Sequence, residues 1–310
     1  MEKRRIGTLS VSVVGLGCNN FGIRLDAERT DRVVHAALDS GIDFFDTADV
    51  YGGTRSEEFL GRALGKRRDE VVFASKFGIP LDEQRKGARP EYVKQALEAS
   101  LKRLGTDRID LYQLHRPDPE VPIADTLGAL EELKQAGKIR EIGSSNFTAE
   151  QIAEAENAVK PGAARFVSVQ NEYSLLQREP ERGVLDACVK RGIAFLPYFP
   201  LASGVLTGKY AKGAPVPGGT RLSAPDGPLT PRFLSERNLE LAGKLQEFAG
   251  KREHTLLELA FSWLLARKAV VSVIAGATSV EQIQANVGAA GWRLTADELQ
   301  EIDRVLVVDG

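Results

Sequence analysis

Short apolar runs of strand length alternate with longer segments of helical periodicity along almost the whole chain. Three of these runs are FFDTA (44–48), VVFASK (71–76) and IDLYQLH (109–115). A helical pattern follows each of them, over residues 56–64, 90–104 and 123–136. Strands that alternate with helices form parallel sheets, because a parallel connection needs a crossover and the helix supplies it. The sequence therefore predicts an α/β fold.

The same pattern continues to the end of the chain, after a short hairpin at residues 4–14. Further strands are expected at 13–17, 140–146, 166–173, 193–199 and 270–277. Further helices are expected at 26–39, 149–159, 180–191, 238–252, 255–267, 280–289 and 296–305. Eight strands over residues 1–310 fit a single-domain (β/α)8 TIM barrel with an N-terminal β-hairpin and an extra C-terminal helix. An open doubly wound sheet, the alternative, would be expected to carry a GxGxxG turn, which the sequence lacks.

Charge and cysteine content exclude several classes of function. The formal net charge is −2 with both signs interspersed, so neither a nucleic acid nor an anionic membrane is expected as a partner. The two cysteines, Cys18 and Cys188, form no CxxC pair, so we expect no metal site and no disulfide framework. The first ten residues lack the apolar core of a signal peptide, and no apolar run has the length of a membrane span. We expect a cytoplasmic, monomeric protein.

Four residues suited to proton chemistry fall at successive junctions between strand and loop: Asp46, Tyr51, Lys76 and His115. Taken singly, each is more often a solvated rim residue or a packing residue. In a TIM barrel, however, these junctions share one face, which carries the active site. A phenol ionises near pH ~10, and a neighbouring cation lowers its pKa. We therefore expect Lys76 to lower the Tyr51 pKa and Asp46 to hold Lys76 charged, while His115 orients a carbonyl oxygen.

Longer motifs give the chain a resemblance to a known family. They are GLG (15–17), GIDFFDTADVYG (41–52), LHRPD (114–118), GKIREIGSSNF (137–147), VQNEYS (169–174), LTGKY (206–210) and IAGATSVEQIQAN (274–286). From end to end the chain resembles an aldo-keto reductase. The resemblance implies an NADP-dependent oxidoreductase that reduces an aldehyde or ketone to an alcohol by hydride transfer, on a barrel without a Rossmann fold. The family's tetrad falls on Asp46, Tyr51, Lys76 and His115, with Tyr51 as general acid and a proton relay from His115.

Two other functions stay open for this fold. One is a non-catalytic regulatory protein that binds the cofactor, like the β-subunits of potassium channels. The other is a lyase that forms a Schiff base through Lys76, although an adjacent Asp46 would keep that amine protonated.

The resemblance also assigns positions to the cofactor. At the nicotinamide end it implies Gly17, Asp46, Ser145, Asn146, Gln170 and Tyr198. Along the pyrophosphate, in the Gly- and Pro-rich loop 200–231 and just before it, it implies Phe199, Leu201, Gly204, Lys209 and Arg221. Around the adenosine it implies Gly276, Thr278, Gln282 and Asn286.

Two positions depart from the family pattern. Many relatives carry a basic residue at or near position 278 to bind the 2′-phosphate of NADP, and here Thr278 has only neutral neighbours in sequence. We therefore expect a smaller preference for NADP over NAD. Asn19 stands where several relatives carry Trp, which predicts a wider or more polar substrate pocket formed by Asn19, Asn20, Tyr51 and His115.

Overall fold

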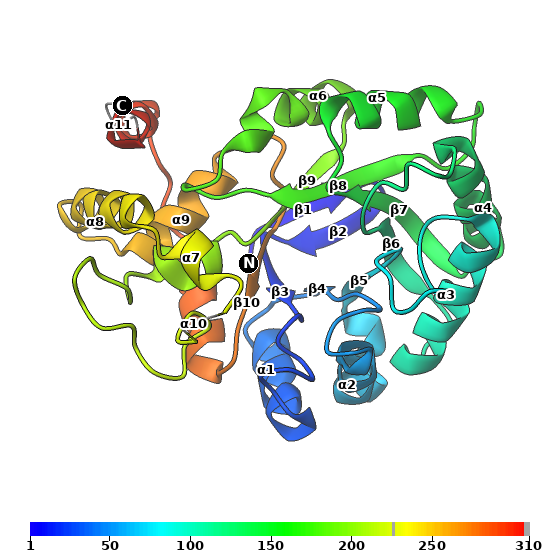
Figure 1. Cartoon of the computed structure of the whole chain (residues 1–310), viewed down its shortest axis with the longest axis horizontal. Coiled ribbons are helices and arrows are strands. Elements are labelled where there is room, and N and C mark those ends of the chain that lie inside the picture. Colours follow the sequence, from blue (N-terminus) through cyan, green and yellow to red (C-terminus); the bar gives the residue numbers. More distant parts are fainter. Residues whose placement is uncertain (225–226, 307–310) are drawn as a thin grey trace.

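The computed structural model describes residues 1–224 and 227–306. Parallel strands form an eight-stranded sheet in the order β10-β3-β4-β5-β6-β7-β8-β9 (Figure 1). The strands are β3 (Val14–Gly17), β4 (Phe44–Asp46), β5 (Val72–Phe77), β6 (Ile109–Leu114), β7 (Ile139–Ser145), β8 (Phe166–Glu172), β9 (Ala194–Tyr198) and β10 (Val273–Gly276).

The sheet curls into a nearly closed barrel. Two hydrogen bonds join its edges: the Phe195 N–H donates to the Ala269 carbonyl at 2.8 Å, and the Val271 N–H donates to the Phe195 carbonyl at 3.1 Å. They connect β9 to the residues just before β10. The predicted TIM barrel is confirmed.

A hairpin closes the N-terminal end of the barrel. Its antiparallel strands are β1 (Lys3–Ile6) and β2 (Leu9–Ser12), and the chain then enters β3 directly. The buried side chains of Ile6, Leu9 and Val11 pack with residues from inside the barrel, including Phe44 and Leu111. This end is therefore filled by apolar side chains, and a large cavity opens at the opposite end, where the strands finish.

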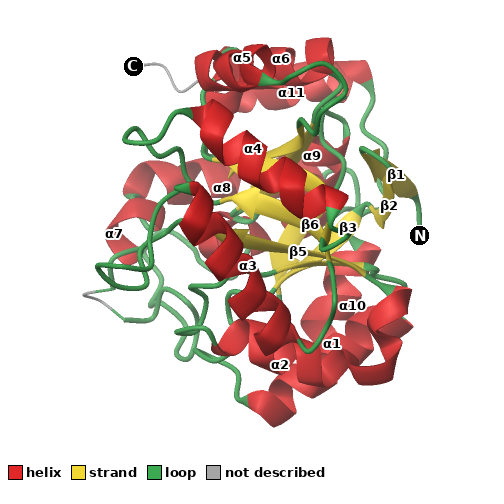
Figure 2. Cartoon of the chain, turned by 90° about the vertical axis from the view of Figure 1, so that its right-hand side faces the viewer, coloured by secondary structure: helices red, strands yellow, loops and turns green. Residues whose placement is uncertain are grey.

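Helices cover the outside of the strands (Figure 2). Those that connect successive strands are α1 (Ala27–Asp39), α2 (Arg55–Leu64), α3 (Pro90–Leu104), α4 (Ile123–Gln135), α5 (Ala149–Ala158) and α6 (Val184–Arg191). The segment between β9 and β10 contains α7 (Thr230–Phe233), α8 (Glu236–Gly250) and α9 (Leu256–Leu265), and α10 (Val280–Gly288) and α11 (Ala296–Leu306) follow β10. Side-chain caps mark several helix starts, as where Asp26 accepts the Arg29 N–H at 2.8 Å before α1.

One local prediction was wrong. The helix expected at 180–191 is a 3₁₀ turn, Glu179–Arg182, followed by α6, because Gly183 between them has φ 128°, which helical backbone does not adopt. The long segment 200–231 before the eighth strand contains a 3₁₀ turn at Ala202–Thr207 and the start of α7. Positions 225 and 226 of this segment lie outside the described residues.

A further 3₁₀ turn, Gly65–Glu70, extends α2. In the described ranges, none of the helices combines the length and apolar character needed to cross a membrane.

Candidate active site

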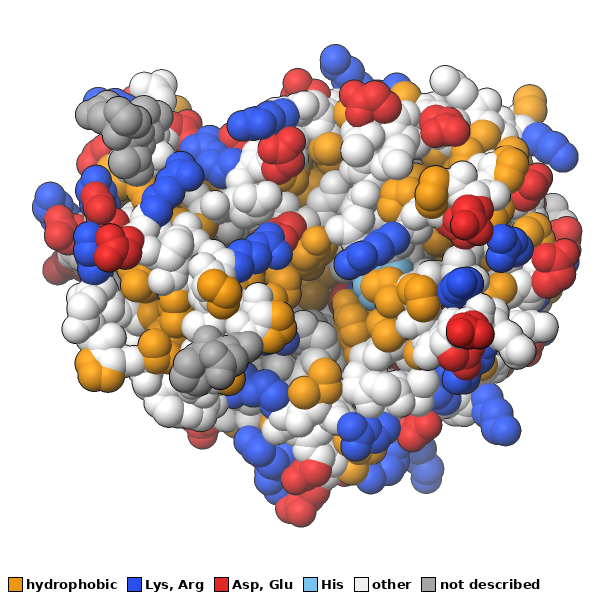
Figure 3. Space-filling model, in the orientation of Figure 1, with side chains coloured by type: hydrophobic (Ala, Val, Ile, Leu, Met, Phe, Trp, Pro, Cys, Tyr) orange, Lys and Arg blue, Asp and Glu red, His pale blue; other side chains and the backbone are white. Residues whose placement is uncertain are grey.

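A cavity of about 700 Å³ opens where the barrel strands end. It is visible as a hollow near the centre of the face shown in Figure 3. Every site residue predicted from the sequence lines it except Lys76, which is fully buried. The predicted residues on its wall are Gly17, Asn19, Asn20, Asp46, Tyr51, His115, Ser145, Asn146, Gln170, Tyr198, Phe199, Leu201, Gly204, Lys209, Arg221, Gly276, Thr278, Gln282 and Asn286.

Lys76 forms the centre of a buried hydrogen-bond network. Its Nζ lies 2.6 Å from Asp46 Oδ2, 2.9 Å from the Thr47 carbonyl oxygen and 3.5 Å from the Tyr51 hydroxyl oxygen. These three acceptors match the three N–H bonds of an ammonium group. The second oxygen of Asp46 accepts a hydrogen bond from Gln170 Nε2 at 2.9 Å. The ion pair is thus fully satisfied inside the protein, and Lys76 itself does not line the cavity, whereas its partners Asp46 and Tyr51 do.

The charges in this network set the protonation of Lys76 and Tyr51. Burial is the largest single effect and lowers the pKa of Lys76, but Asp46 and Tyr51 together outweigh burial and the net pKa is raised. Lys76 is therefore a buried ammonium, which disfavours the Schiff-base lyase.

Burial also raises the pKa of Tyr51, and this effect exceeds the lowering caused by Lys76. The expected lowering by Lys76 is present, but burial, which the sequence did not reveal, outweighs it. The Tyr51 hydroxyl consequently carries its proton near neutral pH.

His115 lies directly after β6 with its ring centroid 5.8 Å from that of Tyr51, and the two rings are nearly perpendicular at 79°. Burial, followed by the positive charges of Lys76 and Arg116, lowers the pKa of His115 to about 2. The imidazole is therefore neutral near pH 7. A neutral ring takes part in hydrogen bonds but holds no extra proton, which argues against a proton relay through His115.

A row of side chains at the ends of β6 to β9 forms the next part of the wall. Ser145 Oγ donates to the Gln170 carbonyl at 2.7 Å, and Asn146 Nδ2 donates to the His115 carbonyl at 3.0 Å. The Tyr198 hydroxyl donates to Asn146 Oδ1 at 2.8 Å. These bonds fix the orientation of the Asn146 amide and the Tyr198 ring before any ligand binds.

Another buried carboxyl group, Asp49, follows β4. Neither of its carboxylate oxygens has a partner within the described residues, in contrast to Asp46. Burial, and then the negative charge of Glu57, raises the pKa of Asp49 to about 7. Of the three acids in the motif 41–52, Asp43 pairs with Lys3 at 2.6 Å and Asp46 pairs with Lys76 at 2.6 Å, whereas Asp49 has no partner within the described residues.

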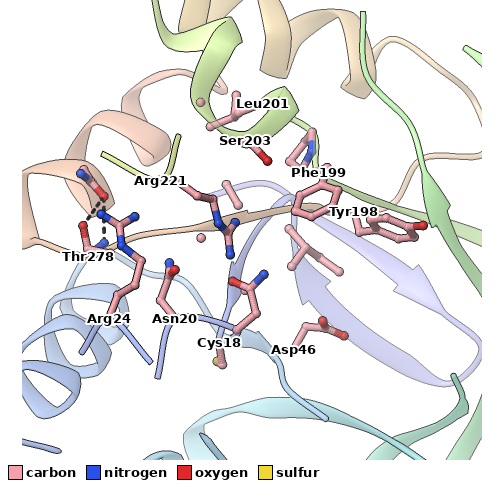
Figure 4. Close-up of a pocket in the computed structure, with 18 of the residues that line it drawn as sticks. Cys18, Asn20, Arg24, Asp46, Tyr198, Phe199, Leu201, Ser203, Arg221 and Thr278 are labelled. Carbon is pink, nitrogen blue, oxygen red and sulfur yellow. Dashed lines mark hydrogen bonds between the residues drawn. The ribbon is translucent and has the colours of Figure 1, made fainter. Parts of the chain in front are cut away.

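The other end of the cavity is lined by cations. Arg24, Lys209 and Arg221 all line it, and none forms an ion pair with a carboxylate in the part of the chain that the structure describes. In Figure 4 the guanidinium groups of Arg24 and Arg221 project into this region. Burial, and next the positive charge of Arg24, lowers the pKa of both Lys209 and Arg221. This wall therefore favours an anionic ligand.

The backbone that carries part of this wall has an unusual conformation. Phe199, Ala202 and Ser203 have positive φ values of 49°, 46° and 56°, which are costly for residues with a side chain. Gly204 follows with φ 100°, and a Cβ atom there would lie 2.8 Å from Lys209 Nζ. Only glycine allows Lys209 to lie in this position.

Arg24 is a cavity residue that the sequence alone did not reveal. It lies in the loop after β3, where its Nη2 donates to the Gly219 carbonyl at 2.6 Å. The same loop contacts the end of β10, since Asn20 Nδ2 lies 3.5 Å from the Ala277 carbonyl oxygen. In Figure 4 the Arg24 side chain extends toward Thr278, whose N–H donates to Gln282 Oε1 at 2.8 Å. The neighbours of Thr278 are neutral in sequence, but a cation faces the same end of the cavity in space.

Other lining residues were also missed: Cys18, Arg116, Glu172, Ser203 and Arg232. Arg116 and Glu172 were within reach of sequence reasoning, because each lies inside a quoted motif at a strand end. Cys18 directly follows β3, Ser203 lies in the 3₁₀ turn Ala202–Thr207 and Arg232 lies in α7, and no quoted motif includes them.

Comparison with known proteins decides the family. The family model described as "Aldo/keto reductase family" matches residues 13–307. The chain belongs to this family. Membership implies NAD(P)H-dependent carbonyl reduction.

Two curated aldo-keto reductases are similar to the chain. It is 34% identical over 311 residues to "Probable aldo-keto reductase 1" of Glycine max, a match that covers 96% of this chain and 87% of the relative. It is 37% identical over 315 residues to "Aldo-keto reductase yakc [NADP(+)]" of Schizosaccharomyces pombe, a match that covers 96% of this chain and 89% of the relative.

Two solved aldo-keto reductase structures share the fold. The glycerol dehydrogenase AKR11B4 from Gluconobacter oxydans has a TM-score of 0.84 and 31% identity, covering 98% of this chain and 94% of that chain. The aldo-keto reductase AKR11C1 from Bacillus halodurans, in its holo form, has a TM-score of 0.82 and 35% identity, and the match covers 98% of this chain and 96% of that chain.

Proposed function

We propose that this protein is an NADPH-dependent reductase of aldehydes or ketones in which Tyr51 is the general acid. One observation carries the proposal: the Tyr51 hydroxyl lines the cavity and lies 3.5 Å from the Nζ of a buried Lys76 that Asp46 holds at 2.6 Å. A proton donor beside a fixed cation suits a reaction in which negative charge develops on a carbonyl oxygen.

A bound nicotinamide dinucleotide would supply the hydride. Tyr51, protonated because burial raises its pKa, donates its proton to the carbonyl oxygen as the alkoxide develops. Lys76 then stabilises the phenolate that remains, and Asp46 keeps Lys76 in place. The neutral His115 ring, near Tyr51 on the cavity wall, orients the carbonyl oxygen. A general acid of this kind contributes roughly 10²–10⁴ in rate.

The residues around the cavity fit such a cofactor. A volume of about 700 Å³ falls in the range of cofactor sites, and three cations without ion-pair partners in the described chain suit the phosphates. The buried Oδ1 of Asn20 and Nδ1 of His115 have no hydrogen-bond partner among the described residues, so both atoms are available to form a hydrogen bond with a ligand. We assign Ser145, Asn146 and Gln170 to the carboxamide, and Tyr198 to the face of the nicotinamide ring.

The remaining cofactor assignments follow the length of the cavity. Phe199, Leu201, Gly204, Lys209 and Arg221 are assigned to the pyrophosphate. Gly276, Thr278, Gln282 and Asn286 are assigned to the adenosine end, with Gly17 and Asp46 beside the nicotinamide.

We further propose that Arg24 supplies the positive charge that position 278 lacks. Arg24 lines the cavity, extends toward Thr278 in Figure 4 and has no carboxylate partner in the described ranges. A charge-assisted bond from a guanidinium to a phosphate is roughly twice as strong as a neutral one. NADP is therefore favoured over NAD, in agreement with the NADP(+) in the name of the fission-yeast relative.

The proposal is tested by two measurements on the wild-type protein. Titration with NADPH and with NADH, followed by quenching of tryptophan fluorescence, gives both dissociation constants. Loss of NADPH absorbance with 4-nitrobenzaldehyde as substrate gives kcat and KM. We expect tighter binding of NADPH and measurable reduction of the aldehyde. Binding without turnover of any aldehyde would instead support the regulatory alternative, and a failure to bind either cofactor would refute the proposal.

A further inference from the structure

The end of the cavity nearest to Tyr51 also carries a cation without a partner. Arg116 follows His115 directly and lines the cavity. Its backbone is held in place through its neighbour, because the His115 N–H donates to the Phe77 carbonyl at 2.8 Å and the His115 carbonyl accepts from Asn146 Nδ2 at 3.0 Å. The Arg116 guanidinium forms no hydrogen bond or ion pair with any residue of 1–224 or 227–306.

No acid on the cavity wall is free to neutralise Arg116. The carboxylates that line the cavity within the described residues are Asp46 and Glu172. Asp46 is bound by Lys76 and Gln170, at 2.6 and 2.9 Å. Glu172, at the end of β8, pairs with Arg232 of α7. The wall beside the tetrad therefore has one uncompensated positive charge, and Lys or Arg side chains flank the hollow in Figure 3.

The charge of Arg116 acts on both sides of the substrate space. It contributes to the low pKa of His115 at the end of β6, after burial and Lys76. Burial and then Glu172 raise the pKa of Tyr198 at the end of β9, and Arg232 and, less strongly, Arg116 oppose that rise. A group bound between His115 and Tyr198 would therefore experience the positive charge of Arg116.

We infer that the carbonyl substrate carries an oxyanion, a carboxylate or a phosphate, which Arg116 binds. This inference rests on the proposed function, because it concerns the same cavity. A guanidinium presents a planar fork of N–H donors that matches either oxyanion in a bidentate pair. Arg232 is the weaker candidate, since Glu172 already neutralises it. Arg116 acts on substrate affinity and leaves the proton transfer to Tyr51.

The test compares aldehydes that differ in charge but hardly in shape. We would measure kcat and KM of wild type and Arg116→Gln with 4-carboxybenzaldehyde and with the neutral near-isostere 4-nitrobenzaldehyde. The variant should raise KM for the carboxylate about tenfold, equivalent to about 1.4 kcal/mol, because it removes a charge-assisted hydrogen bond. The kcat values and the constants for 4-nitrobenzaldehyde should change less than about twofold.

Two additions make the comparison specific. Arg182→Gln removes an exposed arginine that does not line the cavity, and it should behave as wild type. A second pair of substrates, glyceraldehyde 3-phosphate and glyceraldehyde, tests a phosphate in place of a carboxylate. The preferred oxyanion is the one whose substrate shows the larger rise in KM in Arg116→Gln. Added salt should reduce the advantage of the charged substrates in wild type.

Binding separates failure of this inference from failure of the proposed function. Calorimetric titration of 4-(hydroxymethyl)benzoate, the product of the carboxylate reaction, requires no turnover. If wild type reduces no aldehyde, the proposed function fails, while about tenfold weaker binding to Arg116→Gln still supports the oxyanion site. Equal effects of Arg116→Gln on charged and neutral aldehydes, or unchanged binding of the product, would overturn the inference.

Discussion

The two ends of the cavity differ in how their charges are compensated. At the catalytic end, Lys76 and Asp46 are buried, lie 2.6 Å apart and have further hydrogen-bond partners within the barrel. At the far end, Arg24, Lys209 and Arg221 come from loops, and no carboxylate in the described parts of the chain pairs with them. At the first end the Lys76–Asp46 pair is complete without a ligand, and Arg116 is the cation left uncompensated beside it among the described residues. The second end presents three cations whose charge an anion would neutralise.

This difference has consequences for substitution. Removing one member of a buried ion pair leaves an uncompensated charge in the interior, so stability and chemistry suffer together. Removing a cation from the open end relieves repulsion between like charges and costs mainly ligand affinity. The following variants, from the largest expected effect to the smallest, test this difference. Substitutions at the catalytic end should affect stability or chemistry, and substitutions at the far end should affect mainly ligand affinity.

Lys76→Met should have the largest effect. It leaves Asp46 charged and buried, and breaking a buried pair costs about 3–5 kcal/mol in the free energy of unfolding. Reductase activity should collapse, because the Tyr51 phenolate loses its stabilising cation. Denaturant unfolding measures the stability, and steady-state assays measure the activity. The double variant Lys76→Met/Asp46→Asn should recover part of the stability but no activity. A single variant as stable as wild type would show that the pair is not the structural centre of this end.

Tyr51→Phe should separate chemistry from folding. The phenyl ring keeps the packing and removes only the hydroxyl that contacts Lys76 at 3.5 Å. We expect kcat to fall by roughly 10²–10⁴, with cofactor dissociation constants within about twofold of wild type. Steady-state assays and fluorescence titrations measure both. A kcat close to that of wild type would exclude Tyr51 as the general acid.

Arg24→Ala should weaken NADPH binding about tenfold and NADH binding much less, because the lost charge is proposed to face the 2′-phosphate. The folding stability should hardly change. Arg32→Ala is a matched control, since Arg32 is exposed, pairs with Glu28 and lies outside the cavity wall. Titration at two salt concentrations measures the effect, which should shrink with added salt. Equal losses for both cofactors would assign Arg24 to the shared pyrophosphate instead.

Thr278→Arg should have the smallest effect. As a single substitution it should tighten NADPH binding by less than about tenfold and leave the NADH dissociation constant nearly unchanged, because Arg24 already lines that end of the cavity. In the Arg24→Ala background the gain should be larger, and this non-additivity is measured by a double-mutant cycle on the dissociation constants. An unchanged ratio of NADPH to NADH affinity in both backgrounds would show that position 278 does not face the 2′-phosphate.

The alternation of strand and helix patterns was enough to predict the barrel, because each pattern is local and the connection rules are strict. The same locality placed Asp46 and His115 at strand ends. Local patterns failed where a single backbone angle decided the outcome, as at Gly183, whose φ of 128° splits the helix expected at 180–191.

The sequence by itself thus determined which elements form and which chemically useful side chains reach the open end of the barrel. The tertiary structure alone decided their protonation, since burial outweighs the lowering of the Tyr51 pKa by Lys76 and leaves His115 neutral. It also decided which cations share a wall, because Arg24 and Thr278 face one cavity only after the loop following β3 packs against the end of β10. The physical reason is that strand periodicity is encoded by near neighbours in the chain. Desolvation and Coulomb interactions depend instead on distances between residues that only folding brings together.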